Sequence, residues 1–180
     1  MPSRRALLCS APVALALPAL VAPRAQARTR AGASGVVYIV RHAEKASDPQ
    51  QRGDPPLRAE GLARAQALAR LVAGVGLRGV WASAYVRTQT TAAPSAAAAG
   101  LNVQTHDPHD SAGLAHQVRT CGGPCLVVGH TNTVGKLVAA LGGPTLPDLA
   151  DTEYDVLDIV FWGDDHATVH QRLRLGAPCG

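Results

Sequence analysis

The chain has 180 residues, of which 47% are hydrophobic, 17% charged and only 3% aromatic. This composition indicates one globular domain and excludes a disordered or repetitive chain, and it argues against a base-stacking surface for single-stranded nucleic acid. The formal charge is +4 at pH 7, but three arginines lie in residues 1–27, which leaves 14 basic against 13 acidic residues in the rest of the chain. A domain so close to neutral gives no electrostatic reason to expect nucleic acid as a partner.

Residues 1–27 have the three parts of an export signal. Residues 1–5 are basic, residues 6–22 are apolar but contain two prolines, and Ala25-Gln26-Ala27 matches an A-x-A cleavage site. The apolar run is at the lower limit for a membrane span, so we expect cleavage and no stable membrane insertion afterwards. The sequence thus predicts a signal peptide at 1–27, a single domain at 28–180, and a periplasmic or extracellular protein. The paired arginines leave the twin-arginine and general secretory routes both open.

The remaining sequence alternates between strand and helix patterns. A continuous apolar run predicts a buried first strand, and the other elements follow from apolar periodicity and from Gly and Pro positions. In chain order, we expect strand 36–40, helix 57–73, strand 79–82, helix 86–99, strand 101–105, helix 113–120, strand 126–129, helix 133–141, and strands 156–162 and 168–175. The apolar residues at helical spacing in helix 57–73 are Leu57, Leu62, Ala65, Leu68, Leu71 and Val72. Pro94 is expected to kink or divide helix 86–99.

This alternation predicts a three-layer α/β/α sandwich. Its central sheet should be mostly parallel, with the last two strands forming an antiparallel edge. After the leader, three cysteines remain, namely Cys121, Cys125 and Cys179. In an oxidising compartment one disulfide is expected, and its pairing stays open. No fourth ligand lies at zinc-finger spacing, so we expect no metal site.

Cationic side chains follow several of the predicted strands. Arg41 and His42 end the first strand, Arg87 follows the second after a few residues, and His130 follows the fourth. Because the carboxyl ends of parallel strands share one edge of a sheet, these side chains should meet there. They would repel one another unless an anion lay between them. Arginine matches phosphate oxygens, and a neutral imidazole can act as a nucleophile.

The segment after His130 adds to this expectation. Thr131 and Asn132 are candidate caps of the helix at 133–141, whose first backbone N–H groups would then point at the same anion. Phosphoryl transfer needs mainly positioning and charge neutralisation, and these side chains can supply both without a metal or another cofactor.

Four ordered blocks resemble motifs of the histidine phosphatase superfamily, also called phosphoglycerate-mutase-like. Residues 40–45 (VRHAEK) are similar to R-H-x-E, 57–65 (LRAEGLARA) to L-T-x-x-G-x-x-R-A, 83–92 (SAYVRTQTTA) to S-x-x-x-R-T-x-x-T-A, and 127–134 (VVGHTNTV) to G-H-[ST]-N-T-V. Arg58 replaces the usual threonine of the second block. Order and spacing agree over residues 36–162, which resembles a compact, exported bacterial member of the first branch.

The resemblance implies a role for each matching residue. His42 is the nucleophile that forms a phosphohistidine, while Arg41, Arg87 and His130 bind the phosphoryl oxygens and stabilise the transferring charge. Glu44 is implied to be a structural partner of the site. Lys45 and Thr131 are further candidate substrate contacts.

The proton donor for the leaving group does not follow from the motifs. No acidic motif follows Arg87, where mutase-type relatives have a glutamate. Asp107, in the loop after the third strand, is our first candidate and Asp110 the second, although both can instead cap the following short helix. A pocket without a carboxylic acid would favour phosphoramidates such as phosphohistidine.

We therefore expect a metal-independent phosphatase that acts on a phosphorylated small molecule or a phosphoprotein. Short insertions between the blocks predict an open site, which favours hydrolysis over mutase chemistry, because a mutase must keep water from its phosphoenzyme. A phosphoglycerate-mutase-type phosphotransferase remains open as an alternative. So does a noncatalytic module that binds phosphate or a partner with the same pocket.

Overall fold

A computed structural model of the chain describes residues 34–47, 53–163 and 167–176. The predicted leader at 1–27 and Cys179 lie outside these residues. The elements in chain order are β1 (Gly35–Arg41), α1 (Ala59–Val72), β2 (Gly79–Ser83), α2 (Val86–Ala98), β3 (Val103–His106), α3 (Ser111–Thr120), β4 (Cys125–Gly129), α4 (Val134–Ala140), β5 (Val156–Trp162) and β6 (Thr168–Arg174). Each predicted element is present, and its ends differ from the prediction by two residues or fewer.

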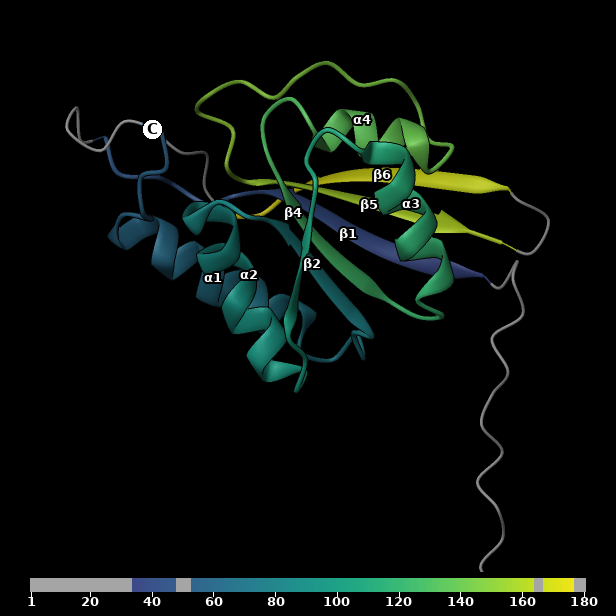
Figure 1. Ribbon diagram of the computed structural model, residues 1–180, viewed down its shortest axis with the longest axis horizontal. Helices are drawn as coiled ribbons and strands as arrows, with labels where there is room; N and C mark the ends of the chain where they lie inside the picture. The colour runs from purple at the N-terminus through teal and green to yellow at the C-terminus, as the bar shows by residue number, and fades with distance from the viewer. Residues whose placement is uncertain (1–33, 48–52, 164–166, 177–180) are drawn as a thin grey trace, which may run out of the picture.

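The six strands form one sheet in the order β3-β2-β4-β1-β5-β6. The first four in this order pair in parallel, whereas β5 and β6 are antiparallel to their neighbours. Helices α1 and α2 lie on one face of the sheet, and α3 and α4 lie on the other (Figure 1). This confirms the predicted three-layer sandwich with a mostly parallel sheet and an antiparallel edge.

Both faces of the central strands are buried. On β1, Val37 and Ile39 belong to the core under α3 and α4, while Val40 belongs to the core under α1 and α2. A strand that packs on both faces needs apolar residues at every position, which explains the continuous run in its sequence. The carboxyl ends of β1, β2 and β4 consequently reach one sheet edge on a rigid, dry support.

Helix α1 differs from the prediction in the face that it buries. Its buried residues are Gly61, Ala65, Leu68, Ala69 and Val72. The side chains of Leu62 and Leu71, which the helical spacing assigned to the core, are 49% and 50% exposed. Apolar residues surround most of this helix, so periodicity alone did not distinguish the packed stripe from the open one.

Pro94 lies inside α2, which continues from Val86 to Ala98 without division. Pro94 was expected to kink or divide the helix, and the division was wrong. A proline removes only its own N–H donor, and the packing of Ala92 and Ala96 in the core holds the helix on both sides of it. Among the described residues, no helix has the length and apolar character needed to cross a membrane.

Candidate active site

The strand register brings two histidines together. Arg41 is paired with Gly129, and the N–H of His42 donates to the carbonyl of Gly129 at 2.9 Å. His42 and His130 therefore leave adjacent strands at the same level. Their ring centroids are 5.5 Å apart in an edge-to-face arrangement.

The ring of His42 is held in one tautomer. Its Nδ1 lies 2.8 Å from the carbonyl of Ala43, and because a carbonyl can only accept, Nδ1 carries the proton. Burial lowers the pKa of His42 from 6.5 to about 3, the bond to Ala43 opposes this, and Arg41 and Arg87 lower the pKa further. The neutral ring therefore keeps a lone pair on Nε2, as a nucleophile requires.

A chain of hydrogen bonds orients His130. Its Nε2 lies 2.7 Å from Ser83 Oγ, which lies 2.9 Å from Thr88 Oγ1. The Thr88 hydroxyl also contacts the carbonyls of Ser83 and Tyr85 at 3.0 and 2.8 Å. Since carbonyls only accept, the direction that satisfies every hydrogen runs from His130 through Ser83 to Thr88. Burial lowers the pKa of His130 to about 4, with further contributions from Arg87 and His106.

Arg41 is buried and held from the loop before β5. Its Nη1 donates to the carbonyls of Ala150 and Asp151 at 2.9 and 3.0 Å, and its guanidinium lies 4.2 Å from the ring centre of Tyr154. Its buried Nε has no hydrogen-bond partner among the described residues. A buried charged donor without a partner is unfavourable unless a ligand completes it.

Arg87 has a similar environment on the other side of the site. Its Nη1 donates to Asp54 Oδ1 at 3.0 Å and to the carbonyl of Gly53 at 3.2 Å. Its guanidinium lies 4.2 Å from the ring centre of Tyr85. The buried Nε of Arg87 also has no partner within the described part of the chain. Both arginines are thus fixed by their ends and by aromatic rings, and each retains an unused donor.

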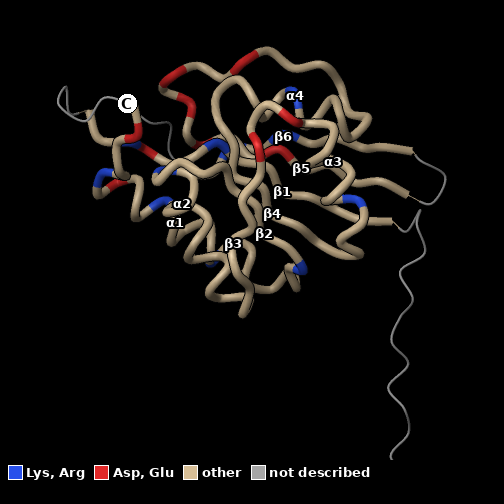
Figure 2. The backbone as a smooth tube through the Cα atoms, in the orientation of Figure 1, with Lys and Arg blue, Asp and Glu red and all other residues tan. Residues whose placement is uncertain are grey.

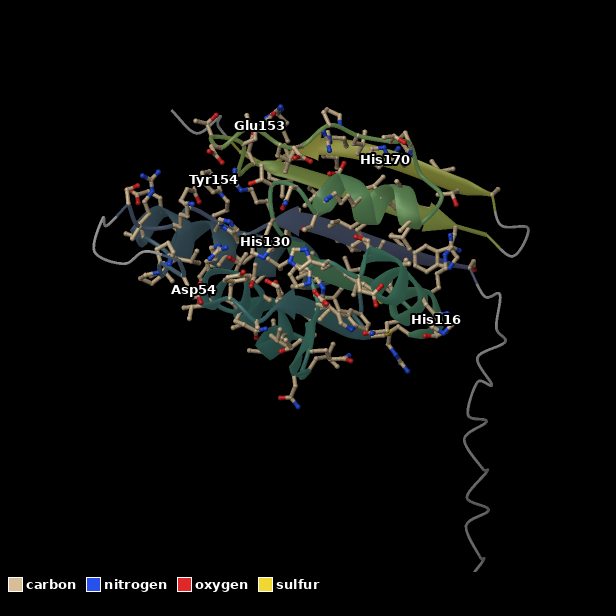
Figure 3. The ribbon with its side chains drawn as sticks, turned by 45° about the horizontal axis from the view of Figure 1, so that its top comes forward. Asp54, His116, His130, Glu153, Tyr154 and His170 are labelled. Carbon is tan, nitrogen blue, oxygen red and sulfur yellow. The ribbon has the colours of Figure 1, made fainter. Side chains whose placement is uncertain are left out.

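These side chains border one cavity of about 330 Å³. Its lining residues are Arg41, His42, Lys45, Tyr85, Arg87, Pro108, His109, His130, Thr131, Asn132, Thr133 and Asp151. The predicted phosphate-binding and substrate-contact residues are all in this set, whereas the two proton-donor candidates, Asp107 and Asp110, are not. Figure 3 shows His130 between Tyr154 and Asp54, with His116 and His170 toward the far end of the sheet. Figure 2 shows acidic residues, in red, distributed along the loop between α4 and β5.

The two acidic candidates have other contacts. Asp107 is exposed, does not line the cavity, and accepts a hydrogen bond from the N–H of His109 at 2.8 Å. Asp110 caps α3, with its Oδ1 accepting from Gly113 N–H at 2.8 Å. The loop therefore borders the cavity with Pro108 and His109 rather than with a carboxylate. Asp151 is the carboxylate residue that the described residues place in the cavity lining.

The helix after His130 begins later than the capping prediction requires. Thr133, not Thr131 or Asn132, is the N-cap of α4. The N–H groups of Thr133 and Val134 donate to the carbonyl of His130, so they are not available to an anion. Thr131 and Asn132 instead line the cavity from a turn.

The motif blocks are tied to one another directly. Glu44, from the first block, accepts three hydrogen bonds of 2.7 to 3.0 Å from Arg64 of the second. The N–H of Ala43 donates to Thr91 Oγ1 of the third block at 3.0 Å. A Cβ on Gly61 would lie 2.3 Å from the carbonyl oxygen of Glu44, so only glycine permits this approach of α1. Glu44 therefore braces the segment that carries His42.

Sequence reasoning missed three residues that shape the site. Asp54 anchors Arg87 and also accepts from the N–H of Val86 at 2.8 Å, at the start of α2. Tyr154 lies against Arg41 and its ring centre is 6.1 Å from that of His42. Tyr85 contacts both Arg87 and His130. Only Tyr85 lay inside a motif block, where its aromatic ring between Ser83 and Arg87 was an available signal.

The described residues contain no group of three His, Cys, Asp or Glu side chains able to hold a metal ion. Cys121 and Cys125 are free thiols, and burial raises the pKa of the Cys125 thiol. The pairing of Cys179 lies outside the described residues.

Comparison with known proteins finds one matching family model and several solved structures with a similar fold. The family model "Histidine phosphatase superfamily (branch 1)" matches residues 37–108. The protein histidine phosphatase SixA complexed with tungstate is 22% identical, with a TM-score of 0.63 over 77% of this chain and 96% of that one. YhfR of Bacillus stearothermophilus is 17% identical, with a TM-score of 0.62 over 81% and 100% of the two chains.

A phosphoglycerate mutase from Bacillus anthracis is 14% identical, with a TM-score of 0.58 over 78% of this chain and 93% of that one. At these identities the solved structures show a shared fold. No curated protein sequence matched the chain. The family match covers the blocks of Arg41, His42 and Arg87, and the sheet brings His130 to them, so over residues 37–108 the chain is similar to branch 1 of the histidine phosphatase superfamily.

Proposed function

We propose that this protein is a metal-independent phosphatase that hydrolyses phosphomonoesters or phosphoramidates through a phosphohistidine on His42. One observation carries the proposal. Arg41 and Arg87 border the same cavity as His42, whose Nδ1 is bonded to Ala43 so that its Nε2 keeps a lone pair. Two guanidinium cations around a neutral nucleophile suit a tetrahedral dianion.

In the first step, the lone pair of His42 Nε2 attacks phosphorus while the bond from phosphorus to the leaving group breaks. The leaving atom takes the bond's electron pair and a proton from solvent or a nearby acid. Arg41 and Arg87 neutralise the equatorial oxygens, and His130 can add a donor because a proton gained at its Nδ1 is stabilised by the bound dianion. His42 retains its Nδ1 proton, held by Ala43, so the product is a phosphorylated imidazolium.

In the second step, water attacks phosphorus and the P–N bond breaks, which returns its electron pair to Nε2 and releases phosphate. An open cavity admits this water directly. Lys45, His109 and Asp151 lie at its border on exposed loops, where they can contact the remainder of the substrate. We expect hydrolysis to exceed transfer because none of these groups separates the phosphohistidine from solvent.

The substrates named for the structural relatives support this range. One relative binds tungstate, a tetrahedral oxyanion, and is a protein histidine phosphatase. Another is a putative α-ribazole-5'-P phosphatase with 16% identity and a TM-score of 0.57. We propose a preference for leaving groups that need little protonation, because the carboxylate at the cavity, Asp151, has a side chain that is 95% exposed.

The test is hydrolysis of p-nitrophenyl phosphate in the presence of a chelator. We expect turnover that survives the chelator and falls by more than about 1000-fold in His42→Ala. His116→Ala is the matched control, because His116 is exposed on α3 and does not border the cavity. Absence of turnover in the intact protein, combined with protection by phosphate against heat, would favour a noncatalytic phosphate-binding module. Transfer to a phosphoglycerate acceptor faster than hydrolysis would favour the mutase.

We also propose that the protein is exported. The proposal rests on the basic residues 1–5, the apolar residues 6–22 and the A-x-A site that ends at Ala27. Mass spectrometry of the protein from a periplasmic or culture fraction should find Arg28 at the N-terminus. An intact N-terminus in a cytoplasmic fraction would contradict export.

A further inference from the structure

A second cavity lies outside the anion site. It is a groove of about 650 Å³ between α1 and the ends of β1, β5 and β6. Arg41 borders both cavities, while Tyr154 and Glu44 border only the groove. The groove is thus separated from the anion site by the segment that follows β1.

The wall that α1 contributes is apolar although it faces solvent. Ala63, Ala67 and Leu71 lie along one stripe of the helix, are exposed, and line the groove. Val156 and Leu175 line it from the sheet side. A helix face open to water ordinarily carries polar residues, so a second apolar stripe opposite apolar strand ends indicates a surface that a ligand covers.

Among the charged side chains that line the groove, some form ion pairs with described residues and one does not. Glu44 and Arg64 neutralise each other at 2.7 Å, and Glu60 pairs with Arg58 at 3.3 Å. Arg70 lines the groove, is exposed, and makes no ion pair with any described residue. The groove therefore combines an apolar body with one unpaired positive charge.

We propose that this groove binds a small anionic amphiphile, with its aromatic or alkyl body against Ala67 and Leu71 and its anionic group at Arg70. The volume lies within the range of small-molecule sites, roughly 300–1,000 Å³, and the surface is concave, which suits an enclosed ligand better than a flat protein partner. The proposal does not depend on the phosphatase activity. Its occupant would contact Tyr154, which lines the groove.

The fluorescent probe 1-anilinonaphthalene-8-sulfonate has this chemistry, with an aromatic body and one sulfonate. We expect saturable binding to the folded protein at one site. Ala67→Phe fills the groove from an exposed position and should weaken binding by at least about tenfold. Gln66→Phe adds the same ring to an exposed position on another face of α1. The affinity of this variant for the probe should stay within about twofold of that of the parent protein.

The charge is tested separately. Arg70→Glu should weaken sulfonate binding by about fivefold, as expected for an exposed ion pair. Lys136→Glu makes the same charge change at an exposed position of α4, on the opposite face of the sheet, and should have no effect. Circular dichroism and thermal unfolding of each variant show whether the fold is retained.

Three results would overturn the proposal. Equal binding by Ala67→Phe and the parent would place the probe elsewhere. Displacement of the probe by inorganic phosphate would place it in the cavity of Arg41 and Arg87. Dissociation of a dimer by Ala67→Phe, with probe binding only to the monomer, would make a second copy of the chain the occupant of the groove.

Discussion

The ion pair between Glu44 and Arg64 should be a structural brace of the catalytic segment rather than part of the chemistry. The side chains of Glu44 and Arg64 are 4% and 24% exposed, and three contacts of 2.7 to 3.0 Å join them. Removing one partner of a fully buried pair costs about 3–5 kcal/mol. Because Arg64 is partly exposed and can be rehydrated, we expect Glu44→Gln to lower the free energy of unfolding by about 2–3 kcal/mol.

Arg64→Gln should lower the free energy of unfolding more than Glu44→Gln, because it removes the ion pair with Arg64 from the less exposed of the two side chains. The double variant should lose about 2 kcal/mol less than the sum of the two single losses, since the second substitution no longer breaks a pair. Urea unfolding at pH 7, followed by circular dichroism, measures these values. Glu60→Gln is the control on the same helix, because its ion pair with Arg58 is exposed and should contribute less than about 0.5 kcal/mol.

The kinetics of the same variants separate bracing from catalysis. If Glu44 only holds the segment before Ala46, Glu44→Gln should retain turnover of p-nitrophenyl phosphate at a temperature where it is folded, with a raised KM. An unchanged free energy of unfolding together with loss of turnover would refute the structural role and place Glu44 in the reaction. A double variant whose loss of stability equals the sum of the two single losses would refute the coupling.

Three further outcomes follow from the structure. The pKa values of His42 and His130 are lowered from 6.5 to about 3 and about 4, so their contribution to stability is complete above pH 6.5 and is lost progressively as the pH falls from 6.5 toward these values. Unfolding in phosphate-free buffer should show a loss of about 2–3 kcal/mol per histidine between pH 7 and 4.5; a constant stability over this range would contradict neutral burial. Arg58 is the N-cap of α1 without a side-chain cap bond, so Arg58→Ser should raise the free energy of unfolding by about 1 kcal/mol, and a loss would show that Arg58 has contacts of greater value. Gly61→Ala should destabilise by about 1–3 kcal/mol instead of giving the usual gain of a helical alanine, because its Cβ would lie 2.3 Å from the Glu44 oxygen; a higher melting temperature would be the contrary result.

The elements of this fold could be predicted from local patterns because each follows from a short-range cause. Continuous apolar runs formed β1 and β4, which pack on both faces. The buried face of α1 could not be predicted in the same way, since Leu62 and Leu71 satisfy the same spacing as Leu68. Which stripe packs depends on where α2 and the sheet lie, and that is a property of the assembled layers.

The residues of the site also fall into those that the sequence predicts and those that it does not. Arg41, His42, Arg87 and His130 could be predicted because the carboxyl ends of parallel strands must share an edge, whatever the details of packing. Asp54 could not be predicted, because its contact with Arg87 joins residues 33 apart through a loop with no regular pattern.

The contact of Tyr154, in the loop before β5, with Arg41 could not be predicted either. Nor could the contact of Asp107, whose carboxylate accepts a hydrogen bond within its own loop. The sequence by itself determined the layers, the strand ends and the charged groups that meet there. Only the tertiary structure decided which rings and carboxylates hold those groups, which nitrogen of each histidine is free, and where an apolar groove lies open among the described residues. These depend on side-chain contacts between distant segments, for which no local periodicity exists.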